Sequence, residues 1–159
     1  RGLSAPLSAV ESWVIGDHGD RMVPVISKAT VSGAALRSVA SAERIDEMCR
    51  RARNAGTEIL GHLREGSAYF APGAAICRML EAIRGEGPEE AIACSAMLDG
   101  HYGVKGLFAG VPAVLGSGGV ERIVEFDLDA DERLDFESAI VGIRERNALA
   151  ERLLSYTRM

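Results

Sequence analysis

Residues 13–24 read Trp-Val-Ile-Gly-Asp-His-Gly-Asp-Arg-Met-Val-Pro, and they join two apolar segments through a turn bounded by glycines. Residues 11–15 and 22–31 have the composition of strands, and the second segment ends at Ser32-Gly33. The turn between them presents His18 beside Asp17 and Asp20. An unperturbed histidine has a pKa of about 6.5, so it can take and give protons near neutral pH. This stretch therefore predicts a β-rich scaffold that presents a candidate general acid and base.

Helical and strand-like periodicities alternate along the rest of the chain. Apolar residues recur at helical spacing from Ser41, a candidate N-cap, to Gly66, and again from about Pro72 to Gly85. Residues 91–98, 110–115 and 120–126 are strand candidates joined by glycine-rich turns. Residues 129–132, Asp-Ala-Asp-Glu, have the spacing of a capping box and predict the start of a long terminal helix. No linker divides the chain, so we expect one domain of mixed α and β structure.

Length and composition narrow the class of protein. The 159 residues can bury a hydrophobic core, and 47% hydrophobic with 26% charged residues is typical of a globular domain. A net charge of −5 offers no basic face for nucleic acid. No apolar run approaches the roughly 20 residues of a membrane span, so no membrane partner is expected. Cys49, Cys77 and Cys94 form no C-x-x-C pair and favour a reducing, cytoplasmic setting.

The three histidines have different prospects as functional residues. His18 is either a catalytic acid and base or a surface histidine in a Gly-Asp turn. A metal site of Asp17, His18 and Asp20 is disfavoured, because adjacent residues rarely converge on one ion and no second histidine lies at ligand spacing. His62, beside an apolar helix stripe, and His101, in a turn with Asp99, are expected to be structural.

Two glycine-containing segments are candidate binding elements. Gly116-Ser117-Gly118-Gly119 has the look of a phosphate-binding loop, but Glu121 replaces the last glycine of a dinucleotide fingerprint and a strand follows. We therefore expect a hairpin turn there and no site for a dinucleotide's phosphates. Residues 66–73, Gly-Ser-Ala-Tyr-Phe-Ala-Pro-Gly, are either a tight junction between helices or the wall of a ligand pocket.

Taken in order, these segments resemble the C-terminal half of the malate/lactate dehydrogenase family, and especially its lactate-dehydrogenase-like malate dehydrogenases. The resemblance extends from about Val10 onward, and its motifs are the histidine turn, the segment before Pro72, Gly-x-Tyr-Gly at 100–103, Gly-Val-Pro at 110–112 and Gly-Val-Glu at 119–121. It implies an α+β fold of mainly antiparallel twisted sheets packed against long helices. It also implies that residues 1–159 are a single C-terminal catalytic domain, without the N-terminal dinucleotide-binding Rossmann domain.

The same resemblance implies roles for particular residues. His18 would exchange a proton with the C2 oxygen of a small dicarboxylic 2-hydroxy or 2-oxo acid, interconverting malate and oxaloacetate. Ala68 would face the substrate, and Pro72 would lie on the nicotinamide side of an NAD cofactor, with NADP left open. The family's histidine-orienting aspartate and carboxylate-binding arginine would precede Arg1, so the isolated chain is expected to be inactive. The chain starts without Met, which is expected of a processed or partial polypeptide.

Other functional interpretations remain open on the sequence alone. A lactate-type 2-hydroxy acid dehydrogenase would carry the same residues. The chain could instead serve as an oligomerisation domain or a complementing subunit, because the family uses this half in homodimer and homotetramer contacts. A metal-dependent hydrolase is the remaining alternative, and we expect no metal.

Overall fold

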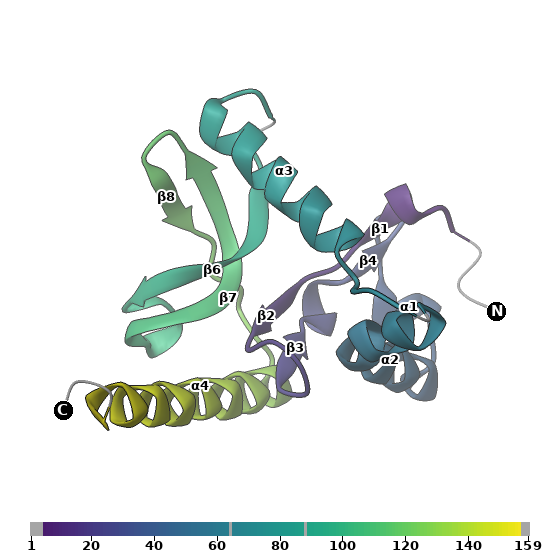
Figure 1. Ribbon diagram of the computed structural model, residues 1–159. Helices are drawn as coiled ribbons and strands as arrows, with labels where there is room; N and C mark the ends of the chain where they lie inside the picture. Colours follow the sequence, from purple (N-terminus) through teal and green to yellow (C-terminus); the bar gives the residue numbers. More distant parts are fainter. Residues whose placement is uncertain (1–4, 64, 88, 157–159) are drawn as a thin grey trace.

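A computed structural model describes residues 5–63, 65–87 and 89–156 (Figure 1). The helices in these residues are α1 (Leu36–Val39), α2 (Ala42–His62), α3 (Phe70–Arg84) and α4 (Ala130–Tyr156). Short 3-10 turns are η1 (Leu7–Ala9), η2 (Ile26–Lys28) and η3 (His101–Gly103). No helix of the described residues is long and apolar enough to cross a bilayer.

The strands pair antiparallel and form two sheets within the described residues. The smaller sheet has the order β1-β4-β5, with β1 at Val10–Glu11, β4 at Thr30–Val31 and β5 at Ala34–Ala35. The larger sheet has the order β3-β2-β7-β6, and β8 also pairs with β7. Its strands are β2 (Val14–Gly16), β3 (Met22–Pro24), β6 (Ala91–Asp99), β7 (Lys105–Gly116) and β8 (Gly119–Ile123).

The long β6–β7 ribbon supplies the apolar face on which the two long helices α3 and α4 pack. Alternate residues of β6 and β7 share that face, because side chains of a strand alternate between its two sides. Near one end of the ribbon, Leu98 and Leu107 join a core with Phe136, Ala139 and Ile140 of α4. Toward the other end, residues of β6 and β7 pack with Met79, Ala82 and Ile83 of α3. Figure 1 shows the ribbon between the two helices.

The fold confirms the α+β class with antiparallel sheets packed against long helices, and several predicted boundaries hold. Ser41 caps α2 by accepting the backbone N–H of Arg44, and α3 ends at Gly85. The predicted glycine-rich turn closes the β7–β8 hairpin, with Gly116 opposite Gly119. Helix α2 ends at His62, however, a full turn before the predicted stop at Gly66.

Four predicted strands were wrong in extent, and one of them, residues 110–115, is only the second half of β7. Residues 11–15 divide between β1 and β2, which belong to different sheets. Residues 22–31 divide into β3 and β4, with η2 between them. The predicted strand over residues 120–126 ends early, and residues 124–126 leave the sheet. The Tyr102 hydroxyl donates a hydrogen bond to the Val124 carbonyl and accepts one from the Phe126 amide.

Candidate active site

His18 lies in the loop that joins β2 to β3. The two strands pair with Ile15 opposite Val23 and Gly16 opposite Met22, which leaves residues 17–21 as the connection. Gly16 has a φ of +85°, a left-handed conformation that turns the chain out of the strand directly before the loop. Gly16 also pairs with Gly110 of β7. A Cβ on Gly110 would lie 3.1 Å from the Gly16 carbonyl oxygen. The glycines therefore let β2 end close against β7.

A cavity of about 400 Å³ opens beside this loop, and we call it the His18 cavity. It is bounded by β2, by the middle of β6 and β7, and by α4. Its polar lining includes Asp17, His18, Ser95 and Arg146, and Ile143 of α4 is part of its apolar lining. A volume of this size is within the range that small ligands occupy in proteins.

Asp17 is the most constrained polar residue of the loop. Its side chain is only 10% exposed, and one carboxylate oxygen lies 2.5 Å from Nη2 of Arg146. The other oxygen accepts the backbone N–H of His18 at 2.7 Å. The His18 residue is itself exposed, and no side chain of the described residues hydrogen-bonds its imidazole. The imidazole is therefore open to a molecule entering from solvent.

Cys94 also lines the His18 cavity. Burial raises the pKa of its thiol, because a thiolate is less favourable away from water. Cysteine nucleophiles react as thiolates, so this thiol is a poor nucleophile at neutral pH. Cys94 is therefore not a candidate nucleophile, and His18 is the candidate proton-transfer group of this cavity.

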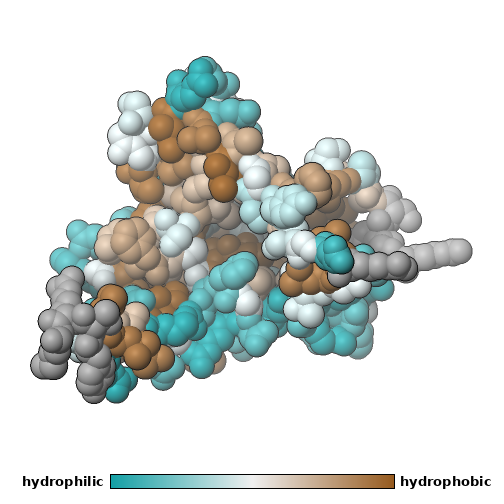
Figure 2. Space-filling view, in the orientation of Figure 1, coloured by the Kyte–Doolittle hydropathy of each residue, from teal (hydrophilic) through white to brown (hydrophobic). Residues whose placement is uncertain are grey.

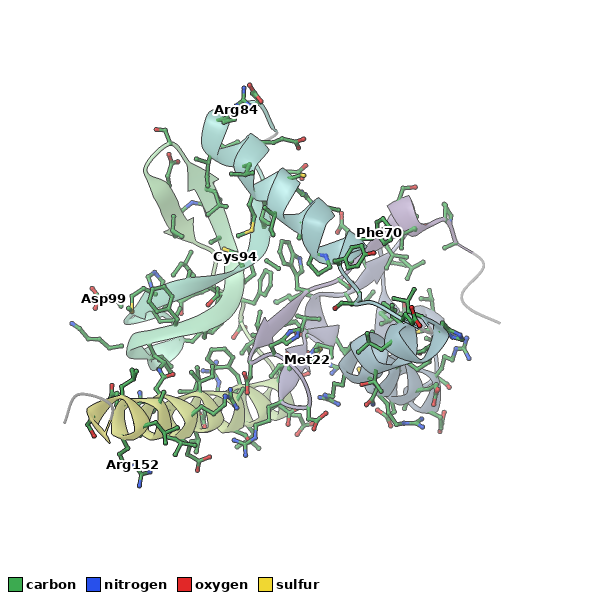
Figure 3. The ribbon with its side chains drawn as sticks, viewed as in Figure 1. Met22, Phe70, Arg84, Cys94, Asp99 and Arg152 are labelled. Carbon is green, nitrogen blue, oxygen red and sulfur yellow. The ribbon has the colours of Figure 1, made fainter. Side chains whose placement is uncertain are left out.

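The segment that carries Ala68 and Pro72 leads into α3. Ala68 is half-buried just before the helix, and Pro72 is exposed in its first turn. Neither residue is among those lining the His18 cavity in the described part of the chain. In Figure 3 the label Phe70 marks the segment that carries Ala68 and Pro72, and the label Met22 marks β3, directly after the His18 loop. The roles of Ala68 and Pro72 stay predictions.

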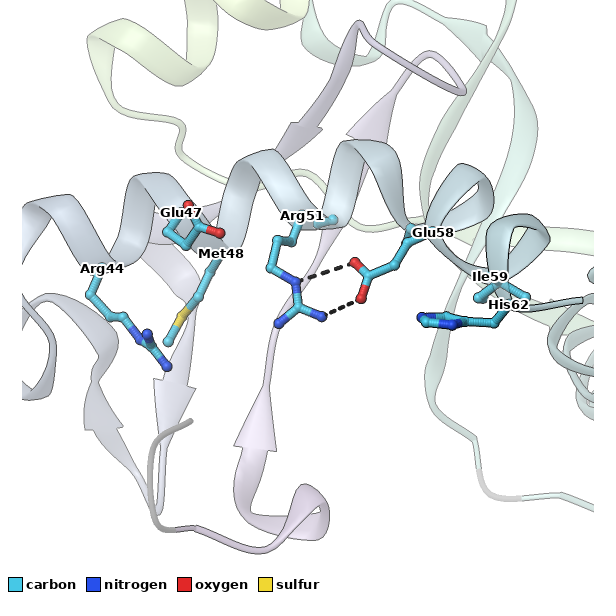
Figure 4. Close-up of a pocket in the computed structure, with 9 residues that line it drawn as sticks. Arg44, Glu47, Met48, Arg51, Glu58, Ile59 and His62 are labelled. Atoms are coloured by element: carbon cyan, nitrogen blue, oxygen red, sulfur yellow. Dashed lines mark hydrogen bonds and ion pairs between the residues drawn. The ribbon is translucent and has the colours of Figure 1, made fainter. Parts of the chain in front are cut away.

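His62 lies at the end of a separate groove along α2 (Figure 4). The predicted apolar stripe of this helix is only partly covered, because Ile45 is buried whereas Ile59 is 42% exposed. Arg51 and Glu58, both on α2, point toward each other along the groove, with Nη2 and Oε1 2.6 Å apart. The groove that contains His62 shares no lining residue with the His18 cavity.

His101 lies in η3, at the turn between β6 and β7. Asp99, which shares this turn, lies 3.1 Å from Nζ of Lys105 through its Oδ1 atom. The Nδ1 atom of His101 is buried without a hydrogen-bond partner among the described residues. Across residues 5–63, 65–87 and 89–156, no group of three or more His, Cys, Asp and Glu side chains is placed to hold a metal ion.

Arg146 is the residue at this site that sequence reasoning missed. Its position on α4 continues the row Ala139, Ile140 and Ile143, and the sequence shows only that this row forms one face of a helix. Helical periodicity does not say which loop such a face meets. Only the packing of α4 against β2 brings Arg146 to Asp17.

Comparison with protein families gives a match over residues 5–150 to the lactate/malate dehydrogenase alpha/beta C-terminal domain. Among curated proteins, a malate dehydrogenase of Neorickettsia sennetsu is 40% identical over 149 residues, which cover 90% of this chain and 47% of that protein. The chain thus spans about half the length of the curated relatives that it matches.

Solved structures give the same result. The malate dehydrogenase of Salinibacter ruber matches with a TM-score of 0.90 and 37% identity, covering 96% of this chain and 49% of that one. The lactate dehydrogenase of Cryptosporidium parvum, solved with lactic acid and β-nicotinamide adenine dinucleotide, matches with a TM-score of 0.88 and 38% identity. That match covers 92% of this chain and 48% of the lactate dehydrogenase.

Proposed function

The chain belongs to the lactate/malate dehydrogenase family, whose C-terminal domain it matches over residues 5–150, and on this premise we propose that it is the catalytic half of an NAD-dependent malate dehydrogenase. The substrate is a small dicarboxylic 2-hydroxy or 2-oxo acid, and malate is favoured over lactate because the curated relative from Neorickettsia sennetsu is a malate dehydrogenase. Residues 1–159 then form one catalytic and substrate domain. The dinucleotide-binding domain belongs to the rest of such an enzyme.

The observation that carries the proposal is an exposed histidine on a fixed loop at a cavity of ligand size. When the 2-hydroxy acid is oxidised, the His18 imidazole takes the proton of the C2 hydroxyl group. In the reverse direction the imidazolium returns that proton to the C2 oxygen, and its positive charge polarises the keto group first. Ala68 and Pro72 are proposed to line the substrate and nicotinamide sides of the complete site.

The described residues provide little of a cofactor site. Gly116–Gly119, the segment closest in composition to a phosphate-binding loop, is the tight end of the β7–β8 hairpin and precedes no helix. A nicotinamide dinucleotide supplies or accepts the hydride in this reaction class. Its phosphates are therefore proposed to bind residues outside this chain, and the choice between NAD and NADP rests with those residues.

We test the proposal in a polypeptide that joins this chain to a dinucleotide-binding half. We expect reduction of oxaloacetate by NADH, and we expect His18→Asn to lower kcat roughly 10²–10⁴-fold, because asparagine cannot transfer the proton. The matched control is His62→Asn, which removes a histidine from the α2 groove and leaves the His18 cavity unchanged. The 159-residue chain alone is expected to show negligible turnover.

Near-normal turnover by His18→Asn, or an equal loss with His62→Asn, would contradict the catalytic role of His18. Assays with pyruvate in place of oxaloacetate separate a lactate-type enzyme from a malate-type enzyme. We extend the proposal to a homodimer or homotetramer. We also propose a reducing, cytoplasmic compartment, and the free thiols of Cys49, Cys77 and Cys94 support this location.

A second candidate function is assembly, in which the chain acts as an oligomerisation or complementing domain without activity of its own. Helix α3 favours it, because Phe70 is 81% exposed and Ile76 and Leu80 are both more than half exposed. A row of large exposed apolar side chains on one helix is typical of a surface that another polypeptide covers.

A further inference from the structure

The loop that carries His18 is attached at both ends to the same helix, α4. Asp17, before the histidine, pairs with Arg146, and Arg21, after it, lies 3.8 Å from Glu145. We propose that Asp17 and Arg146 are positioning residues that hold His18 at its cavity. This inference rests on the function proposed above, because it names the groups that hold the backbone of the proposed acid and base.

The carboxylate of Asp17 has a different partner on each oxygen. Oδ2 lies 2.5 Å from Nη2 of Arg146, and Oδ1 accepts the His18 N–H at 2.7 Å. The carboxylate cannot rotate without lengthening one of these contacts. Because the Asp17 side chain is 90% covered, breaking its ion pair would leave a charge largely removed from water. The ion pair therefore fixes the backbone immediately before the imidazole.

Arg146 is well placed for this task because its helix is fixed by the core. Ala139, Ile140 and Ile143 belong to the core or pack against it, and Arg146 follows Ile143 by three positions on the same helix face. Ile143 and Arg146 both line the His18 cavity. The arginine thus extends the core-facing row to the point where the loop crosses α4.

The other end of the loop makes a second contact with α4. The guanidinium of Arg21 lies against the backbone of Gly142, where a Cβ would overlap it. This contact keeps Arg21 close to Glu145 on the same helix. Glu145 is 67% exposed and lies 3.8 Å from Arg21, whereas Asp17 is 10% exposed and lies 2.5 Å from Arg146, so we assign the main anchoring to Asp17 and Arg146.

The first test measures the order of the loop in the 159-residue chain. We compare backbone ¹⁵N order parameters of residues 17–20 in the wild type, Arg146→Gln and Arg152→Gln. The control residue, Arg152, lies on the same helix, and its guanidinium donates to the local Ala148 carbonyl. We expect the His18 amide to have an order parameter near 0.85 in the wild type and the control, and below about 0.6 in Arg146→Gln. Unchanged values in Arg146→Gln would overturn the proposal.

The second test measures the reaction in the polypeptide that includes a dinucleotide-binding half. A lost contact worth about 1 kcal/mol corresponds to a roughly fivefold fall in kcat for Arg146→Gln, and KM should stay unchanged. Arg146→Lys should recover part of kcat, because it restores a cation beside Asp17. A rise in KM alone would make Arg146 a substrate ligand and would overturn the positioning role, as would an unaltered kcat.

The two experiments separate this inference from the proposed function. If His18→Asn remains active, the proposed function fails, while the order parameters still report whether Asp17 and Arg146 hold the loop. If His18→Asn is inactive but Arg146→Gln has normal order and normal kcat, the proposed function stands and the positioning role is wrong.

Discussion

Gly16 has two separate structural reasons to be glycine. Its φ of +85° is strained for a residue with a Cβ, and a Cβ there would lie 3.0 Å from that of Ala139 on α4. We expect Gly16→Ala to lower the free energy of unfolding by about 2–4 kcal/mol, as the sum of backbone strain and overpacking. Chemical denaturation measures this loss.

Gly19 provides the matched control for that substitution. It has a φ of +99°, but no atom lies within 4 Å of the Cβ that alanine would add. Gly19→Ala should therefore cost only the backbone strain, about 1–2 kcal/mol. Equal losses in the two variants would mean that contact between β2 and α4 does not constrain the start of the His18 loop.

At the residue scale, the sequence predicts local features of the site and misses those that depend on distant contacts. The glycines around His18 identify the turn, because glycine adopts the positive φ angles that turns require. The ion pair of Asp17 with Arg146 has no local signal, since it depends on where α4 crosses the larger sheet. In the structure both carboxylate oxygens of Asp17 have protein partners.

The start of α4 combines a local cap with a contact from a distant segment. Glu132 donates its N–H to Asp129, and the Glu132 carboxylate accepts the Asp129 N–H in return, as the D-x-x-E spacing predicts. The hydrogen bond from the Glu132 amide, followed by that from Arg37, lowers the pKa of Asp129. The ionised form of Asp129 therefore stabilises the native state.

This shift gives a pH dependence with a defined sign. Because the pKa of Asp129 is lower in the folded chain, its contribution is complete above the ordinary aspartate pKa and disappears as the pH falls through the folded value. We expect Asp129→Asn to cost about 0.5–1.5 kcal/mol at pH 7, and the cost should shrink as the pH falls below the ordinary aspartate pKa. Urea denaturation across this pH range measures the difference. Asp127→Asn, at an exposed aspartate, should show a smaller change, and a loss in Asp129→Asn that persists at low pH would refute the assignment.

Helices were easier to predict than strands for a physical reason visible at Glu132. Caps and apolar periodicity are local, so the starts of α2 and α4 follow from nearby residues. The predicted strand over residues 22–31 fails because Glu132, 105 positions away, accepts both the N–H and the hydroxyl of Ser27. Those bonds hold η2 between β3 and β4. Strand limits therefore depend on long-range partners that a local pattern does not contain.

At the scale of the whole molecule, α3 has one packed face and one uncovered face. Met79, Ala82 and Ile83 pack on the sheet, whereas Phe70 is 81% exposed and Leu80 is 53% exposed. Figure 2 shows apolar residues gathered over this helix. Several large apolar side chains on one helix face exceed what scattered surface residues normally present.

This uncovered face leads to the last prediction, which concerns assembly. We expect the 159-residue chain to self-associate at micromolar concentrations, because pairing two such faces removes apolar area from water. The double variant Ile76→Gln with Leu80→Gln should shift it to the monomer in sedimentation velocity. The matched control is Leu149→Gln with Leu154→Gln, at two leucines on α4 that are exposed to a similar extent.

The outcomes distinguish the surfaces and the two candidate functions. A wild-type chain that sediments as a monomer would argue against an assembly role for the isolated domain. Dissociation by the α4 pair but not by the α3 pair would move the contact to α4. If a dinucleotide-binding half added in solution converts the oligomer to a defined complex with oxaloacetate reductase activity, and the α3 substitutions prevent this conversion, α3 serves the catalytic assembly. Such a result would unite the two functions, because the face that causes self-association in the half-length chain would be the one that completes the site around His18.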